Sequence, residues 1–333
     1  MIRKAEEIVN FGAGTADVSR QALTEVDEAH VAILLALYNG GGTLADQLES
    51  IAGQTHTNWS LIVSDDGSSD DGPTQVLAFA KHLAQTVRLI DGPGQGFVRN
   101  FLHLLQAAGP AVPFAALSDQ DDAWLPGKVD RALSLLCDVP SGRPALYAGR
   151  TIICDAALKP LRKSPRFDLP PSFNNALVQS IGGGNTMVLN RAALDLAQET
   201  ARHAGGVVAH DWWLYQLVSG AGGHIVYDPE PMVLYRQHGS NLIGANDTLI
   251  ASGSRLAQLL RGRFRTWNSA NLKALEACHH FLTPESRKTL LDFRQMRQGT
   301  LNERRAALRR AQLYRQTRRG NIALSLAAAM NRV

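Results

Sequence analysis

The chain has 333 residues, of which 45% are hydrophobic and 19% are charged, and its formal net charge is +4. This length allows one large or two small domains with an ample core, and the composition is ordinary for a globular protein. Its three cysteines have no short spacing, so the sequence suggests neither a zinc motif nor a disulfide framework and favours a reducing, cytosolic setting. We expect neither a signal peptide nor a membrane-spanning helix, because no window approaches ~20 apolar residues.

From residue 29 onward the hydrophobic pattern alternates between strands and helices. Strands are predicted at Val31–Leu37, Trp59–Ser64, Val87–Ile90 and Phe114–Leu117, and helices at Leu44–Gln54, Pro73–Leu83 and Phe97–Ala108. This alternation predicts an α/β fold with a doubly wound, mostly parallel sheet. Ligands bind beyond the carboxyl ends of the strands in such sheets. The turns at 38–42, 65–70 and 119–122 should therefore converge on one cleft.

The second half of the chain has a less regular pattern. Strands are predicted at Ala145–Cys154, Asn185–Leu189, His224–Tyr227 and Pro231–Arg236, with a helix at His210–Val218 and mainly helices after Ser254. We expect three parts: an N-terminal extension over 1–28, the sheet domain over 29–249, and a helical, basic region over 250–333.

That last region carries most of the positive charge. Residues 250–333 hold 17 of the 34 Lys and Arg residues but only four of the 30 Asp and Glu residues. The spacing of Leu301, Arg304, Arg305 and Leu308 indicates a helix with an apolar and a cationic side, and such helices bind anionic membrane surfaces. Peripheral membrane contact through residues 255–319 is thus one interpretation, and a solvated face packed on the sheet domain is another. Nucleic acid is not expected, because no binding motif for it is present.

The run Ser118-Asp119-Gln120-Asp121-Asp122 ends an apolar strand. Three carboxylates this close repel one another unless a cation or hydrogen-bond donors neutralise them. Oxygen clusters of this kind suit Mg²⁺ or Mn²⁺, which also hold substrate phosphates. The alternative is that Asp121 and Asp122 cap a helix beginning at Trp124-Leu125-Pro126. A second acidic cluster at residues 65–70 and an acid at position 211 favour the metal-diphosphate interpretation.

Five motifs in a fixed order resemble a known family: Tyr38-Asn39, Asp65-Asp66-Gly67-Ser68, Asp119-Gln120-Asp121-Asp122 followed by Trp124 and Pro126, His210-Asp211-Trp212-Trp213, and Tyr235-Arg236-Gln237-His238-Gly239-Ser240-Asn241. Together they resemble the GT-A glycosyltransferases of family 2, and most closely the bacterial rhamnosyltransferase-like branch, over residues 29–246. The resemblance implies an inverting, metal-dependent enzyme that moves a sugar from a nucleotide-diphosphate donor, with dTDP-L-rhamnose as a candidate. The implied acceptor is a saccharide or a lipid-linked glycan.

The resemblance also implies roles for individual residues. Donor binding falls to Ala36, Tyr38 and Asn39 beside base and ribose, to Asp65 or Asp66 at the N3–H of a pyrimidine base, and to Asp119 and Gln120 near ribose or sugar. Asp121 would bind Mn²⁺ or Mg²⁺, with His238 as a further ligand or a structural histidine. Asp122 would orient waters or cap a helix. Asp211 matches the catalytic base, although the family often has Glu where this chain has His210, and the alternative is a helix cap.

Other polar and aromatic residues have two interpretations each. Arg99 reaches phosphate or is solvated, and Arg236 neutralises the diphosphate or forms an ion pair. Gly183, Gly184 and Asn185 shape the sugar or acceptor pocket or make a tight turn, whereas Trp212 and Trp213 stack on a sugar or belong to the core.

The chemistry of an inverting transfer agrees with this residue set. One carboxylate must deprotonate the acceptor hydroxyl, and a metal stabilises the leaving diphosphate. A sugar nucleotidyltransferase is the competing enzyme class, but its usual Gly-x-Gly-Thr-Arg-type loop is replaced here by Tyr38–Gly42. An inactive sugar-binding scaffold is the non-enzymatic alternative, and the intact acids argue against it.

Overall fold

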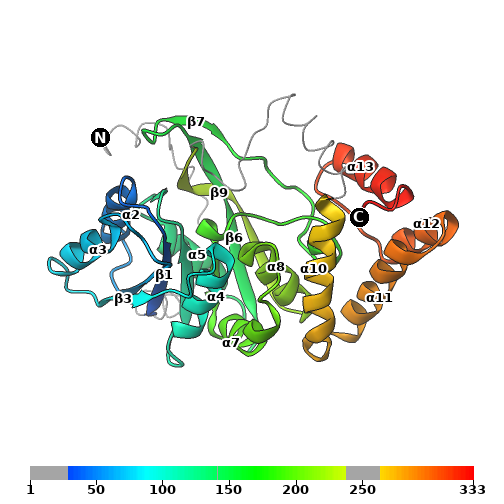
Figure 1. Ribbon diagram of the computed structural model, residues 1–333, viewed down its shortest axis with the longest axis horizontal. Coiled ribbons are helices and arrows are strands. Elements are labelled where there is room, and N and C mark those ends of the chain that lie inside the picture. Colours follow the sequence, from blue (N-terminus) through cyan, green and yellow to red (C-terminus); the bar gives the residue numbers. More distant parts are fainter. Residues whose placement is uncertain (1–28, 141, 238–262) are drawn as a thin grey trace.

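A nine-stranded sheet runs through the molecule and separates two hydrophobic clusters (Figure 1). The computed structural model describes residues 29–140, 142–237 and 263–333. The strand order is β3-β2-β1-β4-β8-β6-β9-β5, and β7 pairs with β6. The expected α/β class is therefore confirmed for the described residues.

The first half follows the predicted alternation. Its elements are β1 (Val31–Leu37), α2 (Leu44–Ala52), β2 (Trp59–Asp65), α3 (Gly72–Ala80), β3 (Val87–Asp91), α4 (Phe97–Ala107) and β4 (Phe114–Ser118). Strand β1 pairs in parallel with both β2 and β4, and β2 pairs in parallel with β3. The side chains of β1 are buried from Val31 to Leu35 because helices cover both faces of the sheet. The carboxyl ends of these strands consequently lie along one edge.

The second half completes the sheet with strands of both directions. Its elements are β5 (Ala123–Trp124), α5 (Lys128–Leu136), β6 (Ala145–Cys154), β7 (Pro160–Lys163), α6 (Phe173–Ala176), η3 (Gly184–Thr186), β8 (Val188–Asn190), α7 (Arg191–Thr200), η4 (Ala201–His203), α8 (His210–Gly220) and β9 (His224–Arg236). Strand β8 is antiparallel to β4 and β6, β7 is antiparallel to β6, and β5 is antiparallel to β9. Strands β6 and β9 are parallel to each other.

Three predictions from the sequence were wrong in detail. Trp124 lies in β5 rather than opening a helix, because Leu125 N donates to Met232 O at 2.9 Å, and the helix begins only at Lys128. Residues 184–186 form a turn stabilised by Thr186 N and Met187 N, so the strand predicted at Asn185–Leu189 begins at Val188. The two short strands predicted at 224–236 are one strand, β9, which passes a register shift beside Gly149.

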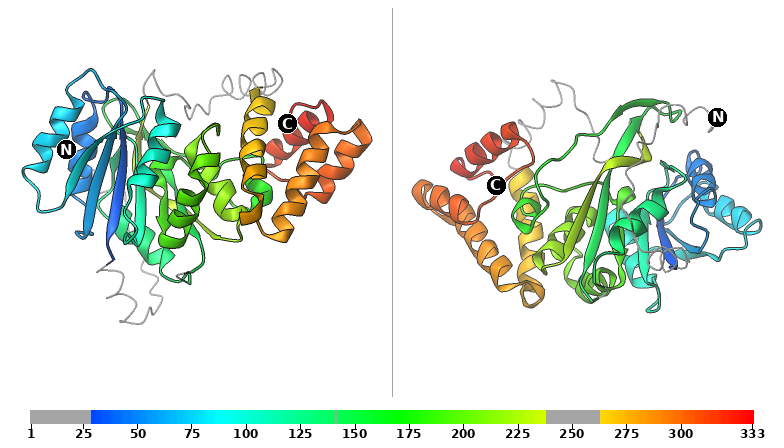
Figure 2. Two further views of the ribbon diagram at one scale, coloured as in Figure 1. Left: turned by 60° about the horizontal axis from the view of Figure 1, so that its bottom comes forward. Right: turned by 180° about the vertical axis from the view of Figure 1, so that it is seen from behind.

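Helices cover both faces of the sheet and continue beyond it. One cluster joins α2, α3 and α5 to the sheet, and the other joins α4, α7 and α8 to its opposite face. The expected C-terminal helices are α10 (Arg263–Ala277), α11 (Pro284–Gln298), α12 (Leu301–Arg310) and α13 (Arg318–Ala329), with the short η5 (His279–Phe281) between α10 and α11. They extend the molecule on the side of α8 (Figure 2), and Leu275, Phe293 and Leu324 share one cluster with Trp213. Within the described ranges no helix has the length and apolarity to span a membrane.

Candidate active site

The three turns predicted to converge do meet, at a cleft of about 1400 Å³ on the carboxyl edge of the parallel strands. The cleft is lined by residues from all three turns and from the second half of the chain. Of the predicted site residues it contains Ala36, Tyr38, Asn39, Asp66, Asp119, Gln120, Asp121, Gly183, Gly184, Asn185 and Asp211. Residues more than 170 positions apart in the sequence thus face one space.

Gln120 fastens the acidic run to the end of β1. Its Oε1 accepts from Tyr38 N at 2.7 Å, and its Nε2 donates to Tyr38 O at 3.0 Å. A Cβ on Gly40 would lie 2.4 Å from the Gln120 side chain, so this close contact requires glycine there. Gln120 therefore fixes the backbone of Tyr38, while the Tyr38 side chain is 58% exposed.

Asn39 joins the turn after β1 to the turn after β2. Its Oδ1 accepts from Ser69 N at 2.8 Å, and its own N–H donates to Ser68 Oγ at 2.9 Å. Asn39 has a positive φ of 48°, a conformation that asparagine tolerates better than most residues. Asp70 adds a third link by accepting from Gly41 N at 2.8 Å. This side of the cleft is therefore built from backbone held by short polar side chains.

The two adjacent acids after β2 have different surroundings. Asp65 accepts from the N–H of Ser68 at 3.1 Å and from its hydroxyl at 2.5 Å, and it does not line the cleft. Asp66 is 8% exposed and accepts from Gly94 N and Gly96 N, both at 2.7 Å, while still lining the cleft. Asp66 thus orders the loop before α4 and is the acid of this pair that a ligand in the cleft can reach.

The acidic run divides between inward and cleft-facing carboxylates. Asp122 is fully buried, and its two oxygens accept from Asn185 Nδ2 at 2.5 Å and from Arg236 N at 3.1 Å. Burial, followed by the charge of Asp121, raises the pKa of Asp122 to about 7. Burial and the charges of Asp122, Asp121 and Asp211 hold the pKa of Asp119 well above its usual range. The acids of this run are therefore close enough to repel one another, and full ionisation of Asp119 is disfavoured.

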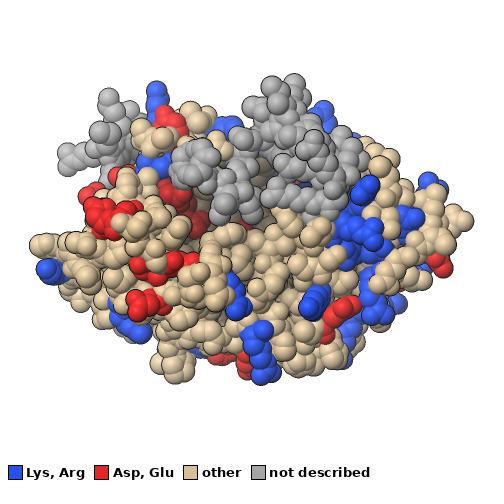
Figure 3. Space-filling view, in the orientation of Figure 1, with Lys and Arg blue, Asp and Glu red and all other residues tan. Residues whose placement is uncertain are grey.

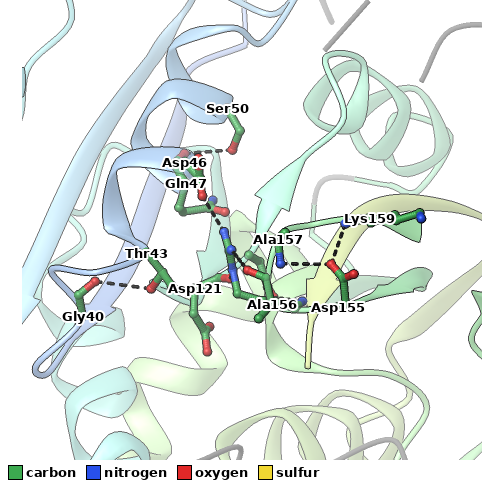
Figure 4. Close-up of polar contacts among 12 residues, drawn as sticks. Gly40, Thr43, Asp46, Gln47, Ser50, Asp121, Asp155, Ala156, Ala157 and Lys159 are labelled. Carbon is green, nitrogen blue, oxygen red and sulfur yellow. Dashed lines mark hydrogen bonds and ion pairs between the residues drawn. The ribbon is translucent and has the colours of Figure 1, made fainter. Parts of the chain in front are cut away.

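Arg236 holds the backbone of the acidic run at Asp121. Its Nε donates to Asp121 O at 2.8 Å, its Nη1 donates to Ala156 O, and its Nη2 pairs with Asp46 Oδ2 at 2.6 Å. Figure 4 shows Asp46, Asp121 and Ala156 gathered here from separate elements, with the Asp121 carboxylate pointing away from Asp46. The arginine is 5% exposed and forms the ion pair that was one of its two expected roles, and it also lines the cleft.

Asp211 lies in the first turn of α8 and lines the cleft, and its charge contributes to the raised pKa of Asp119. Its Oδ1 accepts from Trp212 N at 2.6 Å, and the helix begins before it, with Ala209 at the cap position. Burial raises the pKa of Asp211 to about 6, against the lowering effect of backbone hydrogen bonds, including one from Gly184. A carboxylate with such a pKa is ionised at neutral pH and accepts a proton readily.

His210 is packed tightly beside Asp211. Its ring stacks on Phe101 with a centroid distance of 3.8 Å, and a Cβ on Gly184 would lie 2.1 Å from its Nε2. Neither ring nitrogen has a hydrogen-bond partner within the described part of the chain. Burial lowers the pKa of His210 to about 3, so the ring is neutral and fills space next to the acid.

Three predicted site residues point elsewhere. Trp212 is 6% exposed and donates to Ala176 O at 2.6 Å, and Trp213 is fully buried. Neither lines the cleft, so both belong to the core. Arg99 is also absent from the cleft lining; its guanidinium packs against Gly205, where a Cβ would lie 2.0 Å from Nη1.

One wall of the cleft escaped the sequence analysis. It is formed by Phe167, Tyr227 and Tyr235, with the hydroxyl side chains of Thr151 and Ser164. Phe167 and Tyr227 stack at a centroid distance of 5.5 Å, and the Tyr227 hydroxyl accepts from Phe167 N at 3.2 Å. Phe167 lies in a Pro-rich stretch without periodicity, and only its pairing with Tyr227 shows that it belongs to the site.

Two of the acids that line the cleft, Asp119 and Asp121, are candidates for binding a cation. Within the described ranges no group of three His, Cys, Asp or Glu residues is arranged to hold a metal, and His238 lies outside the described residues. Asp119 and Asp121 both line the cleft, and their repulsion is relieved by a positive charge. Because Mg²⁺ needs only one or two carboxylates beside phosphates and waters, this pair fits a cation that arrives with a diphosphate.

Comparison with known proteins places these residues in context. Residues 32–181 match the family model described as glycosyl transferase family 2. The dTDP-rhamnosyl transferase RfbG of Shigella flexneri is 26% identical over 243 residues, which cover 69% of this chain and 80% of that protein. The Escherichia coli UDP-Glc:alpha-D-GlcNAc-diphosphoundecaprenol beta-1,3-glucosyltransferase WfgD is 28% identical over 172 residues, which cover 51% of this chain and 64% of that protein. A crystal structure of S. aureus TarS 1-349 with UDP-GlcNAc is similar at a TM-score of 0.49 and 13% identity, over 86% of this chain and 93% of that one.

Proposed function

We propose that this chain, which belongs to glycosyl transferase family 2, is an inverting hexosyltransferase that uses a nucleotide-diphosphate sugar and a divalent metal. Its acceptor is a saccharide or a lipid-linked glycan. The observation that carries the proposal is the meeting of Asp119, Asp121 and Asp211 at one cleft with the turns after β1 and β2. An acid cluster suited to a metal-diphosphate and a separate acid suited to proton transfer are what this chemistry needs.

The donor nucleotide binds on the side of the cleft formed by Tyr38, Asn39 and Asp66. The Tyr38 ring is exposed while its backbone is fixed on both sides by Gln120, which leaves the ring free to cover a base. Of the acids after β2, Asp66 reaches the cleft and Asp65 is held by Ser68. We therefore assign recognition of the base to Asp66, and support of its turn to Asp65.

Asp121 and Asp119 hold Mn²⁺ or Mg²⁺ together with the donor diphosphate. When bound, the metal neutralises the charge that gathers on the leaving diphosphate. The protein contributes rigidity: Gln120 fastens the run to β1, and Arg236 holds the Asp121 carbonyl. Asp122 is fully buried, does not line the cleft and has both oxygens bonded within the protein, so it acts as a support for the run.

Asp211 acts as the general base. It takes the proton from the acceptor hydroxyl as that oxygen attacks the anomeric carbon, and the bond to the diphosphate breaks with its electrons on the leaving oxygen. Because the leaving diphosphate needs no proton, one carboxylate is sufficient. The raised pKa of Asp211, about 6, stays below neutral pH and still gives a useful driving force for proton transfer.

The acceptor lies against the wall formed by Phe167, Tyr227 and Tyr235. Aromatic faces suit the apolar C–H surfaces of a sugar ring, and the hydroxyls of Thr151 and Ser164 offer hydrogen bonds. Gly183, Gly184 and Asn185 line the same cleft, and the backbone of Gly184 donates a hydrogen bond to Asp211. The buried Trp212 and Trp213 are not part of this subsite.

The donor sugar is the finest part of the proposal. RfbG is named as a dTDP-rhamnosyl transferase and WfgD as a UDP-glucose enzyme, so dTDP-L-rhamnose and UDP-glucose are the two donors to test first.

A thermal-shift panel tests the donor site directly. UDP, dTDP, GDP and CDP are each added with Mn²⁺ or with EDTA to the wild type, Asp121→Asn and the control Asp91→Asn, whose side chain is exposed outside the cleft. A ligand that binds only the folded state raises the unfolding temperature by mass action. We expect a pyrimidine diphosphate to stabilise the wild type and the control only with metal, and Asp121→Asn to lose that response. No shift with any nucleotide would refute the proposal.

A further inference from the structure

Helix α13 presents a row of large apolar side chains to solvent. Ile322, Leu326 and Met330 are 63%, 56% and 53% exposed. Their spacing of four residues places them on one side of the helix. Single exposed apolar residues are common on protein surfaces, but a contiguous row marks a site of interaction.

The row continues into a groove between α12 and α13. This groove has a volume of about 550 Å³, and Leu308, Ile322 and Leu326 provide its large apolar side chains. Arg305 and Arg309 of α12 line the same groove. Buried Ala307 of α12 and buried Leu324 and Ala327 of α13 belong to one hydrophobic cluster, so the groove between the two helices is a fixed feature of the fold.

Positive charge surrounds this apolar row. Arg305 and Arg309 are exposed on α12, and Arg318 and Arg319 are exposed in the first turn of α13. In Figure 3 the blue side chains gather toward the C-terminal helices, whereas red ones gather around the opposite end near α2 and α3. The surface is therefore apolar along its centre and cationic at its edges.

These two properties together select the occupant. A second copy of the same surface would bring like charges together, and a nucleic acid would leave the apolar row without a partner. An anionic lipid surface satisfies both, because its headgroups pair with arginine and its acyl boundary takes up Ile, Leu and Met side chains. We propose that α12 and α13 dock the enzyme on an anionic membrane through this apolar row and its arginines. The segment predicted from the sequence to contact a membrane, residues 255–319, ends before Ile322, so the apolar row was recognised only in the structure.

Vesicle sedimentation tests the proposal without donor or acceptor, so its outcome is independent of glycosyl transfer. The full chain is mixed with phosphatidylcholine vesicles containing or lacking phosphatidylglycerol at low salt. We expect binding to the anionic vesicles alone. Neutralising Arg305 and Arg309 in Arg305→Gln/Arg309→Gln should weaken binding by about fivefold for each charge, and Ile322→Glu/Leu326→Glu should abolish it.

The matched control is Leu77→Glu on α3, because Leu77 is 54% exposed at the other end of the molecule. It should bind anionic vesicles as the wild type does. Absence of wild-type binding to anionic vesicles would overturn the proposal, and so would full binding by Ile322→Glu/Leu326→Glu. Light scattering on the protein without vesicles tests whether a second copy of the chain covers the row instead. A wild-type dimer that Ile322→Glu/Leu326→Glu converts to a monomer would assign the row to a second copy and overturn the membrane proposal.

Discussion

Comparison of Arg236→Met with Asp46→Asn separates the two kinds of bond that the Arg236 side chain makes. Methionine keeps much of the buried aliphatic volume but removes the donors to Asp121 O and Ala156 O and the ion pair with Asp46. Hydrogen bonds from a charged donor contribute about 1.5–3 kcal/mol each. The ion pair adds less than about 1 kcal/mol, because Asp46 is 54% exposed and screened by solvent.

Arg236→Met should therefore lower the free energy of unfolding by about 2–4 kcal/mol, after allowance for the relief of a buried charge. Asp46→Asn should lower it by less than about 1 kcal/mol. Urea unfolding of both variants gives the comparison. Equal losses in the two variants would contradict the reasoning, since the ion pair would then carry what we assign to the carbonyl bonds.

The same variant should weaken metal binding, because Arg236 fixes the backbone of Asp121. Groups that orient metal ligands typically change metal affinity about 10–100-fold, so the Mn²⁺ concentration for half-maximal nucleotide stabilisation should rise by that factor. Arg150→Met is the matched control: Arg150 donates to Ser164 O at 2.9 Å on the same sheet but makes no described contact with the acidic run. An equal rise in the control would attribute the effect to general loosening of the sheet.

Three further outcomes follow from the site. Asp211→Asn should reduce kcat by about 10²–10⁴-fold while keeping the nucleotide-induced thermal shift. In the wild type, kcat should fall below about pH 6 as Asp211 becomes protonated. A kcat that does not change between about pH 5 and 8 would contradict the role of Asp211 as base. Gly184→Ala should lose activity because its Cβ would meet His210, and Gly184→Ala/His210→Ala should recover part of it if that clash is the cause. Asp122→Asn should be tolerated better than Asp122→Ala in urea unfolding, because the amide of Asn185 has an unbonded oxygen that a flip can offer to the new donor.

The parallel half of the sheet and the meeting of its turns were predictable, because continuous apolar strands alternating with helices have few other arrangements. Asp121 and Asp211 were expected at the same cleft, and both line it. The short antiparallel strands were harder to predict from the sequence. Val188–Asn190 is three residues long and Ala123–Trp124 is two, too short for any periodicity to appear.

Roles that depend on long-range contacts could not be assigned from sequence. The bonds of Arg236 to Asp121 and Asp46, 115 and 190 residues away, could not be read from the sequence, which offered only a diphosphate contact or an ion pair without a named partner. Trp212 was a candidate for stacking on a sugar because it adjoins Asp211. Consecutive residues of a helix point in different directions, however, and the Trp212 side chain lies in the core. The aromatic wall at Phe167 carries no local signal, since its function arises only where the segment meets β9.

The arrangement of the acidic run explains why the cleft should favour a cation with its donor. The folded-state pKa of Asp122 is about 7, above its ordinary value, and the pKa of Asp119 is raised in the same direction. For such groups the folded state is favoured when they are protonated, and that stability is lost as pH rises from about 4 through the raised pKa. At neutral pH the ligand-free cleft therefore carries an electrostatic cost. Under the proposed function, a divalent cation in contact with Asp119 and Asp121 would offset this cost only in the folded state, and the same repulsion would then favour a metal-bound diphosphate over a ligand without a cation.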